Sequence, residues 1–173
     1  LMSIVAEGDR RRHYLAPSRE HEEAAEVTRP QDVPDTDLPA AALGFRVQGY
    51  GMSRHADLFT NRQLVALTTF SDLVGEARER VRQDARLTDC ARPDEYADAV
   101  SVYLALVSSK LADMANSLVS WKPSMDQAIH LFTTQAIPMV WDFSETPPLS
   151  TSHAGGFVVT LGNVAKAIPS GRV

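Results

Sequence analysis

The sequence predicts a mainly α-helical fold: a helical domain with a long antiparallel helix pair, shorter C-terminal helices and an irregular proline-rich N-terminal arm. Two long stretches repeat apolar residues at three- and four-residue steps, which is the period of an amphipathic helix. A short connection joins them, and this favours an antiparallel hairpin. The first 45 or so residues are the least regular. We therefore expect an arm or linker over residues 1–48 and a helical domain over residues 49–173.

Within the arm, Tyr14-Leu15 is expected to be a short extended segment, and Ser18 to cap a brief acidic helix. Prolines interleaved with aspartates then force an extended path that is poor in core residues: Pro30, Pro34 and Pro39. This part is interpreted either as a linker or as an arm lying on the surface.

The first long helix is expected from about Asn61 to Arg86. The Thr60 hydroxyl can accept a hydrogen bond from the first turn, and Gln63 can reach back to the Thr60 backbone N–H. Apolar residues then recur at helical spacing: Leu64, Leu67, Phe70, Val74 and Val81. Because the half after Glu76 is mostly charged, it should face solvent or a partner.

The second long helix has the clearest period, from Tyr96 to Leu118, with Pro93 near its start. Val102 and Leu106 widen its apolar stripe, which predicts that it is covered on more than one side.

Towards the C-terminus, Ser124 and Gln127 repeat the capping-box spacing and predict a third, shorter helix. That helix must end near Pro138. A further helical period runs from Phe157 to Ile168 and is stopped by Pro169.

Composition excludes several classes of protein. A single cysteine, Cys90, excludes an internal disulfide framework and a four-thiolate zinc site, and it fits a reducing cytoplasm. His130 has no second histidine or cysteine at ligand spacing, so no metal residue is expected. No apolar run approaches the roughly 20 residues that cross a bilayer. We expect a cytoplasmic protein without a membrane partner.

The charge pattern leaves nucleic-acid binding open. Seventeen Lys and Arg against 22 Asp and Glu give a net charge of −5, unlike a free-standing DNA-binding domain. Two local groups could still touch phosphate: the run Arg10-Arg11-Arg12-His13, and the group Arg46, Arg54, His55 and Arg62. The same side chains could instead form a solvated face or pair with carboxylates.

An ordered series of segments carries a resemblance to a known family. The segments are Tyr50-Gly51-Met52, Asp57-Leu58-Phe59-Thr60, Arg62-Gln63-Leu64, the stretch Ala66 to Val74, Tyr96-Ala97-Asp98-Ala99-Val100 and Pro138-Met139-Val140-Trp141-Asp142-Phe143. Together they resemble the central region of prokaryotic adenine-specific DNA methylases that contain a zinc ribbon and belong to defence loci, over roughly residues 14 to 168.

The resemblance implies that an S-adenosylmethionine motif and the zinc ribbon lie upstream, and that a catalytic Asp-Pro-Pro-Tyr motif lies downstream. None of these is present here, so no catalytic, cofactor-binding or metal residue is expected in this chain. The nearest string, Thr146-Pro147-Pro148-Leu149, lacks the aromatic ring that stacks on a flipped base and is interpreted as a turn. If the coding sequence ended after Val173, the interpretation as a fragment would fail.

Trp141 and Asp142 are singled out as a structural or functional turn, because a carboxylate interrupts an apolar run there. Asp142 is either a catalytic acid or, as we favour, a structural hydrogen-bond acceptor.

Two classes of function follow. In the first, the chain is a non-catalytic segment of a restriction-modification or phage-defence adenine methyltransferase and helps to hold or read duplex DNA. In the second, it is a helical scaffold that binds the rest of the parent methylase, or a partner from the same locus, without touching DNA. An independent enzyme is the weakest interpretation, because the spacing of the residues does not bring any nucleophile together with a general base.

Overall fold

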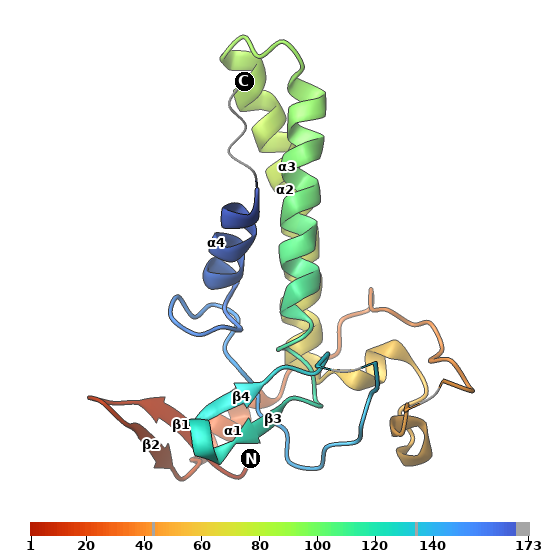
Figure 1. The fold of residues 1–173 in the computed structure, drawn as a ribbon, viewed down its shortest axis with the longest axis vertical. Coiled ribbons are helices and arrows are strands. Elements are labelled where there is room, and N and C mark those ends of the chain that lie inside the picture. The colour runs from red at the N-terminus through yellow and green to blue at the C-terminus, as the bar shows by residue number, and fades with distance from the viewer. Residues whose placement is uncertain (43, 134, 169–173) are drawn as a thin grey trace.

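The computed structural model describes residues 1–42, 44–133 and 135–168. Figure 1 shows an upright helix pair, α2 (Asn61–Leu87) and α3 (Pro93–Leu111), standing on a wider base, with α4 (Phe157–Ala167) beside it. The base holds the arm with α1 (Arg19–Ala25) and two antiparallel hairpins, β1 (Ile4–Glu7) with β2 (Arg12–Leu15) and β3 (Ser120–Lys122) with β4 (Gln127–Ile129). Three short 3-10 helices complete it: Val47–Tyr50, His55–Leu58 and Pro123–Met125. The mainly α prediction is therefore confirmed, with two small sheets added.

Helix α2 begins where the sequence predicts. The Thr60 side chain accepts from the Gln63 backbone N–H, and the Thr60 N–H donates to Gln63 Oε1 at 2.8 Å. This capping box satisfies two backbone groups that a helix start otherwise leaves unpaired. Ser18 and His21 form the same kind of box at the start of α1, so the brief acidic helix is also confirmed.

The long pair is antiparallel. Ion pairs join Arg78 to Asp98 at 2.5 Å and Arg86 to Asp94 at 3.3 Å, so positions later in α2 meet positions earlier in α3. On the inner side of α3, Ala97, Val107 and Leu111 are buried. Helix α4 packs beside them, and Phe157 stacks on Phe70 of α2 with ring centroids 4.6 Å apart.

The expected length of α3 is wrong. The helix ends at Leu111 instead of continuing to Leu118. The Asn116 side chain closes a buried turn there, since its Nδ2 donates to the Ala112 carbonyl at 2.8 Å and its Oδ1 accepts from the Leu118 N–H at 2.9 Å. Asparagine competes with the helical ladder in this way, and the apolar residues beyond it enter the core of the base instead.

The helix expected from Ser124 is also wrong, because residues 120–129 form the β3–β4 hairpin. Asp126 at its turn has φ 47°, a left-handed conformation that no α-helix contains. The β1–β2 hairpin supports this turn from the side: the Tyr14 hydroxyl donates to Asp126 Oδ1 at 2.7 Å, and its ring meets Trp121 edge-on. The last helix, α4, is confirmed, while the stop at Pro169 lies outside the described residues.

The main core lies in the base, below the helix pair. Its buried members come from widely separated parts of the chain: Leu38, Val47, Leu58, Leu118, Leu131 and Ile137. Two of them belong to residues 1–48, so the arm contributes to the core that the later residues build. The boundary near residue 48 stays a prediction.

The prediction that α3 is covered on more than one side rested on Val102 and Leu106, and it is not met at these two residues. Helices α2 and α4 both pack against α3. Val102 and Leu106 nevertheless keep 58% and 53% of their accessible surface.

Candidate functional site

Three members of the predicted cationic group, Arg54, His55 and Arg62, lie at the approach to α2, and two of them hold the arm. Arg54 pairs with Asp35 at 2.5 Å and approaches Asp37 at 3.9 Å. Beside it, His55 Nδ1 lies 3.0 Å from the Thr36 hydroxyl. The hydrogen bond to Asp35, with the charge of that carboxylate, raises the pKa of Arg54. These two side chains therefore fasten residues 35–37 to the short helix His55–Leu58.

Arg62 joins three segments of the base. Its Nε and Nη2 donate to the two carboxylate oxygens of Glu145 at 3.0 and 2.7 Å, a bidentate pair. Its Nη1 donates to the Ala25 carbonyl at 2.6 Å, at the end of α1. The hydrogen bond to Glu145 raises the pKa of Arg62 and outweighs the opposing effect of burial. This guanidinium already has a carboxylate partner where a phosphate would otherwise bind.

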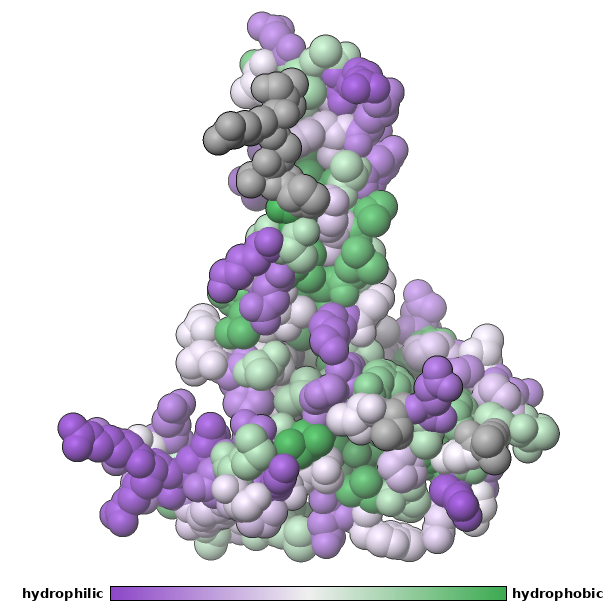
Figure 2. Space-filling model, viewed as in Figure 1, coloured by the Kyte–Doolittle hydropathy of each residue, from purple (hydrophilic) through white to green (hydrophobic). Residues whose placement is uncertain are grey.

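Arg46 and the arginines of the β1–β2 turn are placed differently. The Arg46 backbone N–H donates to the Ile137 carbonyl at 3.1 Å, and its side chain is exposed. Arg10 and Arg11 are exposed at the turn, and Arg12 begins β2. Within the described part of the chain, none of these four forms an ion pair. Figure 2 shows strongly hydrophilic atoms projecting where Figure 1 places this hairpin.

Trp141 and Asp142 lie on the surface of the base. The indole keeps 73% of its accessible surface and meets the exposed Tyr50 ring edge-on, with centroids 5.2 Å apart. Asp142 is exposed and accepts no hydrogen bond from a described residue. The two rings form an exposed edge-to-face apolar contact. The structural hydrogen bond that we favoured for Asp142 is absent among the described residues.

The turn predicted at Thr146 to Leu149 is present one residue later, over 147–150, since the Ser150 N–H donates to the Pro147 carbonyl at 3.2 Å. Thr146 is buried and its hydroxyl donates to the Met114 carbonyl at 3.3 Å. The hydroxyl is thus engaged in the fold and not presented to a ligand.

A buried carboxylate that the sequence did not single out lies where α3 enters the base. The Asp113 side chain keeps 5% of its accessible surface. Its Oδ1 accepts from the Phe132 N–H at 2.8 Å, and its Oδ2 contacts Lys110 Nζ at 2.6 Å and His130 Nδ1 at 3.2 Å. The only local signal is the three-residue step from Lys110 to Asp113.

Burial by itself would raise the pKa of Asp113. The hydrogen bonds from Lys110 and Phe132, with the nearby charges of Lys110 and His130, outweigh burial, and the pKa lies below its ordinary value. The carboxylate therefore stays ionised at neutral pH and ties α3 to residues 130–132. Both carboxylate oxygens thus have partners within the chain. Among the described residues, no cluster of three or more His, Cys, Asp or Glu could hold a metal ion.

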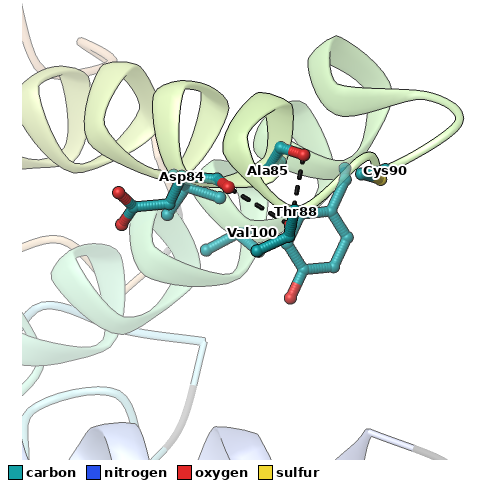
Figure 3. Close-up of a pocket in the computed structure, with 7 residues that line it drawn as sticks. Asp84, Ala85, Thr88, Cys90 and Val100 are labelled. Atoms are coloured by element: carbon teal, nitrogen blue, oxygen red, sulfur yellow. Dashed lines mark hydrogen bonds between the residues drawn. The ribbon is translucent and has the colours of Figure 1, made fainter.

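A shallow cleft of about 430 Å³ lies at the far end of the helix pair, where α2 turns into α3. Figure 3 shows Asp84, Ala85, Thr88, Cys90 and Val100 around it, with the Thr88 hydroxyl donating to the Asp84 and Ala85 carbonyls at 3.2 Å. The Asp84 carboxylate points away from the Cys90 thiol in this view. Within the lining of this cleft, the Cys90 thiol therefore has no carboxylate directed at it that could act as a general base.

Comparisons with protein-family models, with curated proteins and with solved structures found no match to this chain. Among the described helices, none combines the length and apolar character required to cross a membrane.

Proposed function

We propose that this chain is an internal, non-catalytic helical segment of an S-adenosylmethionine-dependent DNA adenine-N6 methyltransferase. The proposal starts from the resemblance of the segments between Tyr50 and Phe143 to the zinc-ribbon methylases. Methyl transfer, the cofactor motif and zinc belong, in this proposal, to other parts of the parent enzyme. The role of this chain is to pack against them.

The observation that carries the proposal is an excess of accessible surface. A compact monomer of 18.9 kDa exposes about 8,300 Å². This chain exposes 11912 Å², a surplus of about 3,600 Å². Large apolar residues contribute to that surface, among them Leu87, Trp141 and Leu149. A segment that packs against the rest of an enzyme would bury such a surplus.

A contact with duplex DNA is favoured by the β1–β2 turn. A two-stranded ribbon fits the major groove of DNA, and cations without acidic partners are the ones available to phosphate. Arg10, Arg11 and Arg46 are exposed cations of this kind within the described residues. Arg54 and Arg62 have carboxylate partners, so a phosphate would have to compete with Asp35 and Glu145.

The alternative is a helical scaffold that never meets DNA. The net charge of −5 and the internal ion pairs of Arg54 and Arg62 favour it. Under this alternative the excess surface still binds protein, either the rest of the methylase or a partner from the same locus.

Titration of a fluorescent duplex with the purified chain, followed by anisotropy at low and moderate salt, separates these roles. We expect binding that weakens steeply with salt and is lost in Arg10→Ser/Arg11→Ser. The matched control, Arg80→Ser/Arg92→Ser, removes two other exposed arginines and should bind as the wild type does. No binding at low salt would contradict the DNA role and leave the scaffold.

The fragment proposal has its own test in the coding sequence. We expect the reading frame to continue past Val173 into an Asp-Pro-Pro-Tyr motif and to contain a cysteine-rich ribbon upstream. A stop codon directly after Val173 would contradict the proposal, whatever the DNA titration gives.

A further inference from the structure

The outer face of α3 is apolar and uncovered. Between Asp98 and Lys110 the helix carries no charged residue. The side chains on its outer side are Ala99, Val102, Tyr103 and Leu106, and all four are exposed. Figure 2 shows hydrophobic atoms gathered midway up the upright part of the molecule, where Figure 1 places α3 in front of α2. An apolar surface of this kind, bounded by polar residues, marks an interaction site.

The fold of the chain itself does not require this face. The inner side of α3 already buries Ala97, Val107 and Leu111 towards α2 and α4. Alanine, serine or a charged residue at positions 102 and 106 would leave that packing unchanged. The outer apolar residues are therefore available for a contact beyond the described chain.

We propose that a second copy of this chain covers the face, with the two α3 helices antiparallel across a twofold axis. Glu95 and Lys110 lie at the two ends of the apolar face. At 3.6 residues per turn, these two residues share with Val102 and Leu106 roughly a quarter of the helix circumference. The midpoint between Glu95 and Lys110 falls between Val102 and Tyr103, at the middle of α3 (Pro93–Leu111).

The charges select the antiparallel arrangement. In that arrangement Glu95 of each copy faces Lys110 of the other, while Ala99 faces Leu106 and Val102 faces Tyr103. In a parallel arrangement Glu95 would face Glu95, which is repulsive. Both side chains already have a partner in their own chain, Glu95 with Arg92 at 2.7 Å and Lys110 with the buried Asp113. Glu95 is 66% exposed with a second carboxylate oxygen, and Lys110 is 62% exposed with three donors, so each can make a further contact.

The shape and the surface area allow this contact. The 19 residues of α3 span about 28 Å, and an antiparallel partner places its wide base beyond the hairpin end of the first copy (Figure 1). A stable interface buries about 800 Å² on each partner, well below the surplus of about 3,600 Å². Most of the surplus thus remains for other contacts, so the inference goes beyond the proposed function and does not depend on it.

The first test is the oligomeric state of the full chain in sedimentation velocity over micromolar concentrations. We expect a dimer, and a monomer for Leu106→Glu with an unchanged circular dichroism spectrum, because the exposed side chain can accept the charge without unfolding the helix. Leu73→Glu is the matched control: it places the same charge on a 45% exposed leucine of α2 and should stay dimeric. A wild-type monomer throughout would overturn the proposal and indicate that another protein covers the face.

The second test fixes the orientation. In a Cys90→Ser background, Val102→Cys lies next to the twofold axis and should form an intermolecular disulfide under mild oxidation. Ser109→Cys lies towards one end of the same helix, meets a different position of the partner and should not cross-link. Cross-linking of both variants would indicate a parallel pair and overturn the antiparallel assignment. Glu95→Lys should weaken the dimer roughly tenfold, because both end pairs become repulsive.

Discussion

The upright helix pair and the base are stabilised in different ways. Along α2 and α3 the contacts repeat from turn to turn, and exposed ion pairs such as Arg78 with Asp98 and Arg86 with Asp94 accompany a narrow buried stripe. In the base, contacts join residues far apart in sequence, and polar groups such as Asp113 and Asn116 are buried and hydrogen-bonded. The difference indicates that long-range buried contacts are concentrated in the base, while the helix pair keeps apolar side chains such as Val102 and Leu106 exposed.

The largest expected effect tests where the core lies. Leu118→Ala should lower the free energy of unfolding by about 3 kcal/mol, because Leu118 is buried in the main cluster and leaves a cavity. Leu104→Ala makes the same change at a half-buried position of α3 and should cost about 1 kcal/mol. Urea denaturation measures both, and equal losses would contradict the contrast between the two regions.

The next effect concerns the junction between them. Asp113→Ala should cost about 2 to 3 kcal/mol, because it removes a charged acceptor from the Phe132 N–H, Lys110 and His130. Asp142→Ala removes an exposed carboxylate and should stay within about 0.5 kcal/mol of the wild type in the same urea titrations. If Asp142→Ala lowered the free energy of unfolding as much as Asp113→Ala, the burial of Asp113 would not be the cause of its effect.

The charge of Asp113 also gives a dependence on pH. Its pKa is lower in the folded chain than in the unfolded one, so its ionisation stabilises the fold above the ordinary aspartate pKa. This contribution is lost as the pH falls through the lowered pKa. The stability difference between wild type and Asp113→Asn should therefore shrink in acid, when urea titrations are compared at neutral pH and below pH about 4. A stability difference that does not change with pH would show that the charge of Asp113 does not contribute.

A smaller effect tests the start of α2. Thr60→Ala removes the capping acceptor for the Gln63 N–H and should cost about 1 kcal/mol. Thr60→Ser keeps the hydroxyl and should restore most of the loss in thermal or urea unfolding. Equal losses in the two variants would show that the methyl group, not the cap, matters there.

The smallest effect belongs to the ion pairs of the helix pair. Arg78→Ser breaks the contact with Asp98, yet both side chains are partly exposed, so we expect an unfolding midpoint close to that of the wild type. A shift of the urea midpoint as large as that of Leu118→Ala would mean that these charges, and not the buried stripe, hold α2 and α3 together.

The candidate site was predictable only in part. The sequence identified Arg46, Arg54, His55 and Arg62 as one group. In the structure Arg54, His55 and Arg62 lie in the chain that leads into α2, whereas Arg46 precedes the short helix Val47–Tyr50 and contacts Ile137 through its backbone. The sequence could not show that Arg62 is bound to Glu145, 83 residues away, or that Arg54 is bound to Asp35. Asp113 was missed for the same reason, because its partners at 130 and 132 come close only when the base folds.

What the sequence by itself determined are features set within a few residues. The caps at Ser18 and Thr60, the apolar period of α2 and the start of α4 depend on neighbours three or four positions away. Only the tertiary structure decided that α3 ends at Leu111 and that residues 120–129 form a hairpin, although Ser124 and Gln127 have helix-start spacing. The hydrogen bond from Tyr14, the buried Asp113 and the core cluster supply contacts between distant residues, and these outweigh a local preference of about 1 kcal/mol.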